Sequence, residues 1–180
     1  IQLLMNLLLF SYYPMVPMIA RDVLNVGPGM TGVLQATAGM GAVVGTIFIA
    51  GSKNIRYHGR ILISGSILSL FGLLLFALSG IYTISIIALF MLGLGHAGFT
   101  PMLFTIIMML SDGDMRGKVL GISTIVIGLG PIGTLIVGGV ANATNPSFAI
   151  GLNSCIGILS LVLIGTLMPE IRHKTSKNSD

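Results

Sequence analysis

The stretch Ser111–Ala141, SDGDMRGKVLGISTIVIGLGPIGTLIVGGVA, decides how this chain folds. It opens with a charged hairpin, Asp112–Lys118, and then continues to Ala141 without an Asp, Glu, Lys, Arg or His. A helix needs about 20 apolar residues to cross the hydrocarbon core of a bilayer, and this uncharged run is long enough. The stretch therefore predicts a hairpin at the membrane surface followed by a transmembrane helix.

The same run is rich in small residues and has a proline near its centre. They are Gly121, Gly128, Gly130, Pro131, Gly133, Gly138 and Gly139. In water each interior glycine would cost a helix about 1 kcal/mol and a proline about 3 kcal/mol. In lipid, small residues let neighbouring backbones approach closely, and this packing holds helices together. The positions that we assign to helix packing or gating here are Gly128, Gly130, Pro131 and Gly133.

The composition of the whole chain supports a membrane protein. Its 180 residues are 54% hydrophobic and only 8% charged, whereas a soluble domain has roughly 25% charged residues. The net charge of +4 lies in hairpins and the tail, so it indicates no nucleic-acid face. One cysteine, Cys155, excludes an intrachain disulfide and a cysteine metal cluster. We predict an all-α integral membrane protein without a metal or cofactor.

Apolar segments predict six transmembrane helices joined by short hairpins, at about 1–20, 30–50, 61–78, 81–110, 118–140 and 147–167. Residues 1–168 would form the bundle and residues 169–180 a polar tail. Pro14 and Pro17 are expected to weaken the second half of the first helix. Gly41 and Gly45 form a GxxxG packing pair in the second helix. Pro101 lies inside the fourth helix, where it weakens the backbone.

The basic residues predict the orientation of the bundle. The hairpins at 51–60 and 111–118 and the tail hold all but one of them: Lys53, Arg56, Arg60, Arg116, Lys118, Arg172, Lys174 and Lys177. The opposite loops hold Arg21 alone. By the positive-inside rule, both ends of this segment are cytoplasmic.

Two segments also suggest an internal repeat. The sequence GMGAVVGTIFIAG at 39–51 is similar to GLGPIGTLIVGG at 128–139 when one residue is gapped. These segments are the middle helices of two successive three-helix units and cross the membrane in opposite directions. Inverted repeats of this kind occur in many secondary transporters.

These features resemble the C-terminal six-helix half of a major facilitator superfamily transporter. The resemblance covers the whole chain and is carried by the Asp114-Met-Arg116-Gly117-Lys118 hairpin and the Gly-Pro-rich helix at 128–139. The stretch 17–45 is similar to the bacterial exporter branch that includes siderophore and macrolide efflux proteins. In the hairpin at 51–60, the residues that fit the superfamily's basic signature are Gly51, Arg56, Gly59 and Arg60, but the acidic residue of that signature is missing.

The resemblance implies a secondary active transporter that exports small organic molecules by alternating access, coupled to ions or protons as in an antiporter. It implies a multi-pass protein of the bacterial inner membrane. Helices one, two, four and five would line the cavity, and helices three and six would face lipid. The chain starts close to the first membrane residue without a Met, so we expect an N-terminal six-helix half in the same polypeptide.

Polar residues in the cavity helices are the substrate-cavity candidates: Asn6, Tyr12, Tyr13, Gln35, His96 and Thr100. The tyrosines could instead belong to an aromatic belt or a helix contact. His96 is the one ionisable side chain between the hairpins, and such residues within membranes are functional candidates. It could carry a proton or contact substrate, or be a neutral imidazole bonded to a neighbouring helix.

Two other classes of function remain open. A self-contained six-helix protein could dimerise or act as a channel or scaffold. An intramembrane enzyme is disfavoured because the sequence offers no catalytic set of residues beside His96. We therefore predict that the protein is not an enzyme.

Overall fold

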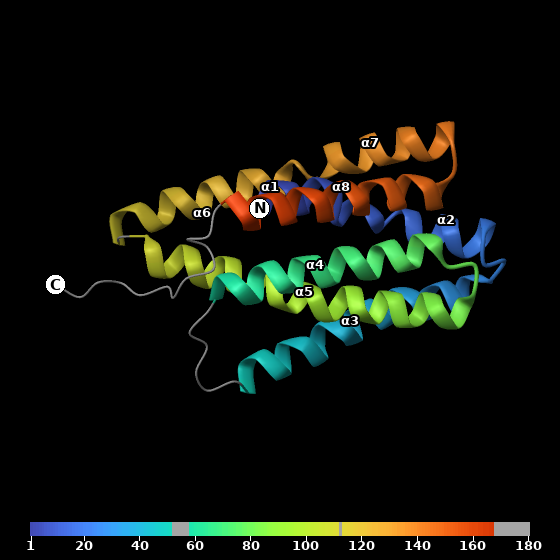
Figure 1. Cartoon of the computed structure of the whole chain (residues 1–180), viewed down its shortest axis with the longest axis horizontal. Coiled ribbons are helices and arrows are strands. Elements are labelled where there is room, and N and C mark those ends of the chain that lie inside the picture. Colours follow the sequence, from blue (N-terminus) through green and yellow to red (C-terminus); the bar gives the residue numbers. More distant parts are fainter. Residues whose placement is uncertain (52–57, 112, 168–180) are drawn as a thin grey trace.

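The computed structural model describes residues 1–51, 58–111 and 113–167, and this part of the chain is helical (Figure 1). Its elements are α1 (Gln2–Leu8), the 3-10 helix η1 (Phe10–Tyr12), α2 (Met15–Asp22), α3 (Pro28–Gly51), α4 (His58–Leu78), α5 (Tyr82–Leu110), α6 (Gly113–Gly128), α7 (Gly130–Ala143) and α8 (Pro146–Leu167).

Six helical segments in the described part are long and apolar enough to cross a membrane. They are Gln2–Asp22, Pro28–Gly51, His58–Leu78, Tyr82–Met109, Met115–Ala143 and Pro146–Leu167. The segments run back and forth along the long axis of the molecule, so that successive turns lie at opposite ends (Figure 1). The predicted all-α, six-helix architecture is confirmed.

The first span is broken into α1, η1 and α2. Regular helix ends at Leu8 and restarts at Met15, directly after Pro14. Pro17 lies in the first turn of α2, where a missing N–H removes no helical hydrogen bond. The break therefore begins earlier than the prolines alone predict. The hydroxyl of Ser11 donates to the carbonyl of Leu7 at 3.1 Å, which satisfies an acceptor that the break leaves free.

A side chain from the last helix also supports this break. The amide nitrogen of Asn153 on α8 lies 3.3 Å from the Ser11 hydroxyl and 3.5 Å from the carbonyl oxygen of Leu8. Broken helices are tolerated at membrane depth where surrounding protein satisfies the freed backbone groups. Asn153 supplies such a group.

The fifth span has a second break, at Leu129. Helix α6 ends at Gly128 and α7 starts at Gly130. Pro131 occupies the first turn of α7, a position that tolerates proline. The proline therefore starts a new helix after the break instead of bending a continuous one.

Helix α5 is the centre of the densest packing, because glycines bring α3 and α4 onto it. A methyl group at Gly93 of α5 would collide with the backbone carbonyl oxygen of Ala38 on α3. On the other side, Gly65 of α4 lies against Gly95 and Gly98 of α5. The hydroxyl of Ser69 on α4 donates to the carbonyl of Leu92 on α5 at 3.1 Å.

The glycines of the predicted repeat occupy matching places. On α3, Gly41 faces the backbone of Phe90 and Gly45 faces that of Leu94, both on α5. Because α5 is the first helix of the second three-helix unit, these contacts join the two units.

On α7, the aligned residues Gly130 and Gly133 face Asn6 and Leu7 of α1, which is the first helix of the other unit. Each middle helix therefore uses the same glycine pair against the opposite unit, as an inverted repeat requires.

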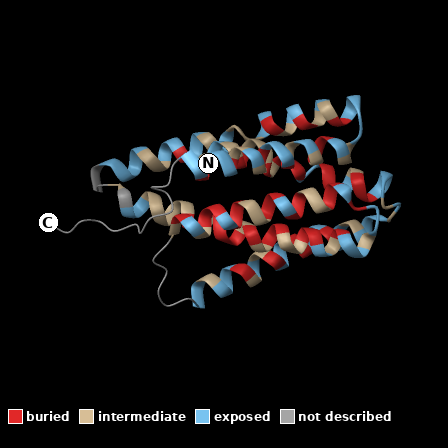
Figure 2. Ribbon diagram, viewed as in Figure 1, coloured by how far each residue is buried: buried red, intermediate tan, exposed pale blue. Residues whose placement is uncertain are grey.

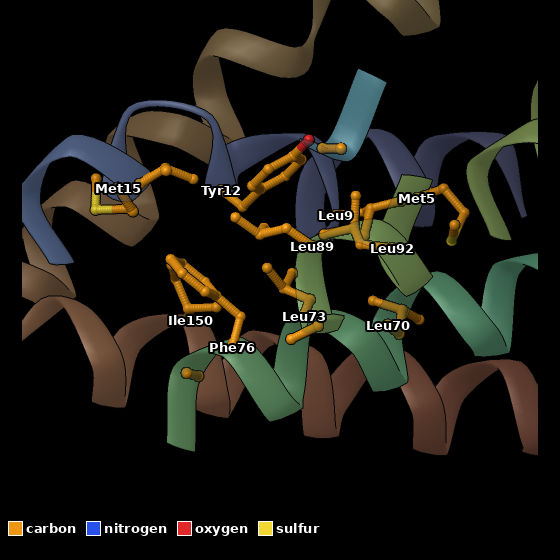
Figure 3. Packing of buried hydrophobic residues seen from close by; sticks show 14 of the residues in the cluster. Met5, Leu9, Tyr12, Met15, Leu70, Leu73, Phe76, Leu89, Leu92 and Ile150 are labelled. Atoms are coloured by element: carbon orange, nitrogen blue, oxygen red, sulfur yellow. The ribbon is translucent and has the colours of Figure 1, made fainter. Parts of the chain in front are cut away.

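A hydrophobic core joins the two units (Figure 3). Its labelled members come from the first span, α4, α5 and α8: Met5, Leu9, Tyr12, Met15, Leu70, Leu73, Phe76, Leu89, Leu92 and Ile150. Close packing of such side chains holds membrane helices together, since lipid supplies no hydrophobic drive between them.

Burial differs strongly between spans (Figure 2). In the apolar 18-residue stretch of each span, 50% of the residues of α4 are buried inside the bundle, compared with 28% for α3 and 11% for the span Met115–Ala143. The third predicted helix, α4, was expected to face lipid. Only part of its surface is free to do so, because Gly65 and Gly72 let α5 cover one face of it. Helices α3, α6 and α7 present the widest exposed surfaces.

Candidate functional site

A cavity of about 320 Å³ lies between the first, fourth and fifth spans. Its apolar walls are formed by Phe10, Phe99, Leu103, Phe104 and Ile127. Polar groups enter it from Gln2, Asn6 and Thr100. The cavity therefore contains two residues that the sequence marked as substrate-cavity candidates, Asn6 and Thr100.

Helical spacing explains how α5 forms one wall. Thr100 and Phe104 are four residues apart, and Phe99 and Leu103 repeat that spacing, so all four share one side of the helix. Pro101 lies among them, where its missing N–H leaves the carbonyl of Ala97 without its usual partner. The wall is thus built on the locally weakened part of α5.

The two breaks described above form the opposite side of the cavity. Phe10 belongs to η1, immediately after α1, and Gly130 is the first residue of α7. Helix α1 contributes Gln2 and Asn6, which are four residues apart and therefore share a face. The cavity is consequently bounded by the interrupted parts of both broken spans.

Asn6 is almost fully buried, with 6% of its surface exposed, and its amide has no hydrogen-bond partner among the described residues. A methyl group at Gly130 would lie 2.6 Å from its Oδ1 atom, so the absence of a side chain at Gly130 makes room for the amide. Gln2, by contrast, donates its Nε2 hydrogen to the carbonyl oxygen of Ser123 at 3.2 Å.

His96 lies beside the cavity wall. Its Nε2 atom is 3.1 Å from the hydroxyl of Thr100, and its ring contacts that of Phe10 edge to face, with 5.1 Å between centroids. Both partners line the cavity. His96 can therefore orient Thr100 and Phe10. It does not line the cavity itself, as a substrate contact would, and its hydroxyl partner belongs to its own helix and not to a neighbouring one.

The two tyrosines do not line this cavity. Tyr12 is 4% exposed and points into the hydrophobic core (Figure 3). Tyr13 is 52% exposed and stacks on Tyr12 with 4.5 Å between ring centroids. Their placement agrees with the alternative of a helix contact for Tyr12.

Gln35 lies in a different hollow, of about 630 Å³, between the end of α2 and the start of α3. Arg21 also lines this hollow, and its guanidinium is bound to the carboxylate of Asp22 at 2.6 Å. The structure therefore separates Gln35 from Asn6 and Thr100.

The predicted packing glycines divide into two groups. Four of them, Gly41, Gly45, Gly130 and Gly133, lie against another helix, whereas nothing in the described part lies within 4 Å of a methyl group placed at Gly128. A packing role for Gly128 within this bundle is therefore not observed. Its exposed position is shared with Gly39, the aligned residue in the repeat.

The charged hairpins are only partly described. Arg56 and the side chain of Asp114 lie outside the described part. Arg116 is exposed and donates its Nε hydrogen to the carbonyl of Ser111 at 3.3 Å, which links the first turn of α6 to the end of α5. Gly59 is buried at the start of α4 and Arg60 is exposed. A methyl group placed at Gly117 would meet no other described residue within 4 Å.

Sequence reasoning missed most of the apolar wall and Gln2. The helical spacing of four residues was an available signal, because it puts His96, Thr100 and Phe104 on one face of the same helix. The contribution of Ile127 and Phe10 depends on where the two spans break, and the spacing of residues does not show this.

Residues 1–180 match the sequence model of the protein family named Major Facilitator Superfamily. The chain belongs to the major facilitator superfamily. This superfamily consists of membrane transporters, so the six helices are those of a multi-pass membrane protein of that class. No match was found among curated proteins. In this major facilitator chain, the cavity beside Asn6 and Thr100 is the best candidate for a substrate site.

Proposed function

We propose that this bundle is one half of a secondary active transporter that exports small organic molecules by alternating access. The observation that carries the proposal is the position of the cavity between two interrupted spans and the proline-containing part of α5. Transporters of this kind bind substrate at the midplane beside discontinuous helices. The walls of this cavity can therefore change shape with small movements of the breaks.

A second six-helix bundle in the same polypeptide would complete the transporter. The exposed surfaces of α3 and of α6–α7 support this part of the proposal. They hold exposed glycines such as Gly39 and Gly128, where a methyl group added in place of a hydrogen would meet no other part of the described chain within 4 Å. Small residues at such surfaces allow close helix approach. A second copy of this chain is the alternative occupant.

Orientation, coupling and branch are further parts of the proposal. By the positive-inside rule, the basic hairpins support a cytoplasmic location for both ends of the segment, and we propose a bacterial inner membrane. No carboxylate belongs to the lining of the cavity, so ion or proton coupling would use His96 or residues of the other bundle. The exporter branch is proposed from the sequence of residues 17–45.

The test uses the complete reading frame expressed in a bacterial strain that lacks its main efflux systems. Accumulation of a panel of fluorescent small molecules is measured with and without an uncoupler that collapses the proton gradient. We expect lower accumulation of at least one compound, reversed by the uncoupler.

A matched pair of variants then links this activity to the cavity. Phe104→Trp fills the cavity and should abolish export, whereas Phe71→Trp makes the same change at an exposed site on α4 and should not. Equal export by both variants, with both proteins present in the membrane, would contradict the proposal. Cross-linked dimers of this chain alone would favour the two-copy arrangement.

A further inference from the structure

The cavity also carries information about the chemistry of its ligand, and this inference rests on the proposed function. Of the three polar side chains that line it, two have partners within the bundle. Gln2 donates to the Ser123 carbonyl, and Thr100 bonds with His96. Asn6 has none among the described residues, although it is almost fully buried.

The Asn6 amide is not among the fully buried polar atoms that lack a partner, so it is reached from the cavity. A ligand that displaces water from this amide must replace the hydrogen bonds that the water made, because an unpaired polar group is costly once it is desolvated. Asn6 offers an NH₂ donor and a carbonyl acceptor side by side. A ligand group with one acceptor and one donor in the same arrangement would satisfy both at once. Carboxamides, lactams and heteroaromatic amines have this pattern.

The remaining walls specify the rest of the ligand. Three phenylalanine rings, those of Phe10, Phe99 and Phe104, border the cavity, and such rings pack favourably against another aromatic ring. None of the lining residues carries a charge. An ion would therefore lose its hydration without gaining a counter-charge, which is costly at membrane depth.

We propose that the cavity takes neutral molecules in which an aromatic ring system carries a carboxamide-like donor–acceptor pair, and that Asn6 binds this pair. The volume of about 320 Å³ is at the lower end of ligand pockets, which span roughly 300–1,000 Å³. A bicyclic ring with one amide substituent is a suitable size.

Three probes of nearly equal shape test this assignment. Naphthalene-2-carboxamide has a donor and an acceptor, 2-acetylnaphthalene has an acceptor only, and 2-naphthoate is an anion. Their binding to the complete protein in lipid nanodiscs is measured by equilibrium dialysis, with empty nanodiscs correcting for partition into lipid. We expect the carboxamide to bind about tenfold more tightly than the ketone, since one hydrogen bond is lost, and the naphthoate to bind most weakly.

Two variants connect this order to Asn6. Asn6→Leu keeps the branched four-atom skeleton of the side chain and removes both polar groups, so the carboxamide should lose its advantage over the ketone. Asn142→Leu removes an exposed amide near the end of α7 and should leave the order unchanged. If Asn6→Leu does not fold, the order measured on the unmodified protein still decides the question.

Different results overturn the inference and the proposed function. Equal binding of the three probes, or an unchanged carboxamide-to-ketone ratio in Asn6→Leu, would overturn the inference, even if other compounds are exported. Selective binding of the carboxamide, with no gradient-driven movement in proteoliposomes of this probe or of any compound in the panel, would overturn the proposed function and leave the assignment of Asn6 standing.

Discussion

Helices α3 and α7 cross their partner helices with the same pair of glycines but with different results. Gly41 and Gly45 bring α3 against α5, and both helices continue through the crossing. Gly130 and Gly133 bring α7 against α1, yet both spans are interrupted close to the crossing. The first crossing makes a closed seam, and the second borders the cavity.

This difference shows that a repeated packing motif can serve two purposes. We infer that the α3–α5 seam is the fixed part of the bundle and that the α1–α7 crossing is the adjustable part. Helix α5 belongs to both regions, because Leu94 and Ala97 contact Gly45 of α3 while Thr100 faces the cavity. Helix α5 would therefore stay in place with α3 while α1 and α7 move relative to it.

The largest effect is expected from Gly93→Ala in the fixed seam. The new methyl group would meet the backbone carbonyl of Ala38, which has no flexible end to move aside. Overpacking of this kind costs roughly 1–3 kcal/mol, so we expect loss of most folded protein on size-exclusion chromatography in detergent. Gly39→Ala is the control, because its new methyl group would meet no other part of the described chain within 4 Å. Normal recovery of Gly93→Ala would contradict a closed seam.

His96→Ala should have the next largest effect, on transport and not on folding. It removes the side chain that contacts both Thr100 and Phe10, so two residues of the cavity wall lose their support. We expect export to fall about tenfold, since the loss of one hydrogen bond and one ring contact is worth about 1.4 kcal/mol, which is a tenfold change in affinity. Membrane levels of the protein should be unchanged. Full export by this variant would refute a role for His96.

Gly133→Ala tests the adjustable crossing directly. Its methyl group would meet the backbone oxygen of Leu7, but Leu7 lies just before the break and can shift. We therefore expect a smaller loss of thermal stability than for Gly93→Ala, about 1 kcal/mol, together with reduced export. Gly138→Ala, which has open space around it in the described part, should change neither. A loss of stability equal to that of Gly93→Ala would remove the distinction between the two crossings.

Gly130→Ala should have the smallest effect. The added methyl group would meet only the end of the Asn6 side chain, which can rotate away. Stability should be nearly unchanged, and affinity for naphthalene-2-carboxamide should fall severalfold, as expected when about one hydrogen bond is displaced. Gly128→Ala provides the comparison, at an exposed position two residues earlier. An affinity loss in Gly128→Ala alone would show that the cavity does not extend to Gly130 and Asn6.

The fold followed from the sequence because long apolar runs and charged hairpins leave few alternatives in a membrane. The repeat glycines were also recognisable, since Gly41 and Gly130 align once a single residue is gapped. The burial of α4 was not predicted. It depends on two glycines, Gly65 and Gly72, whose effect comes from their position at the crossing with α5 and not from their number.

The cavity was predicted only in part. Asn6 and Thr100 could be identified because polar residues are rare in apolar helices. Tyr12 has the same polarity but points into the core, and Gln35 lies in another hollow. The direction in which each polar side chain points depends on how far the helix has rotated about its axis after its break. The position of Pro14 did not reveal that the first break begins at Leu9.

The most direct test of the central claim compares distances across the two regions. Spin labels at Ile47 and Ile87 report on α3 and α5, and labels at Leu3 and Met108 report on α1 and α5; all four positions are at least partly exposed, and Cys155→Ser removes the native thiol. Pulsed electron paramagnetic resonance on the complete protein in nanodiscs should give one narrow distance for the first pair. The second pair should give a broader distribution that shifts when naphthalene-2-carboxamide is added. Equal widths for both pairs, or a ligand-induced shift confined to the first pair, would contradict the division into a fixed seam and an adjustable cavity wall.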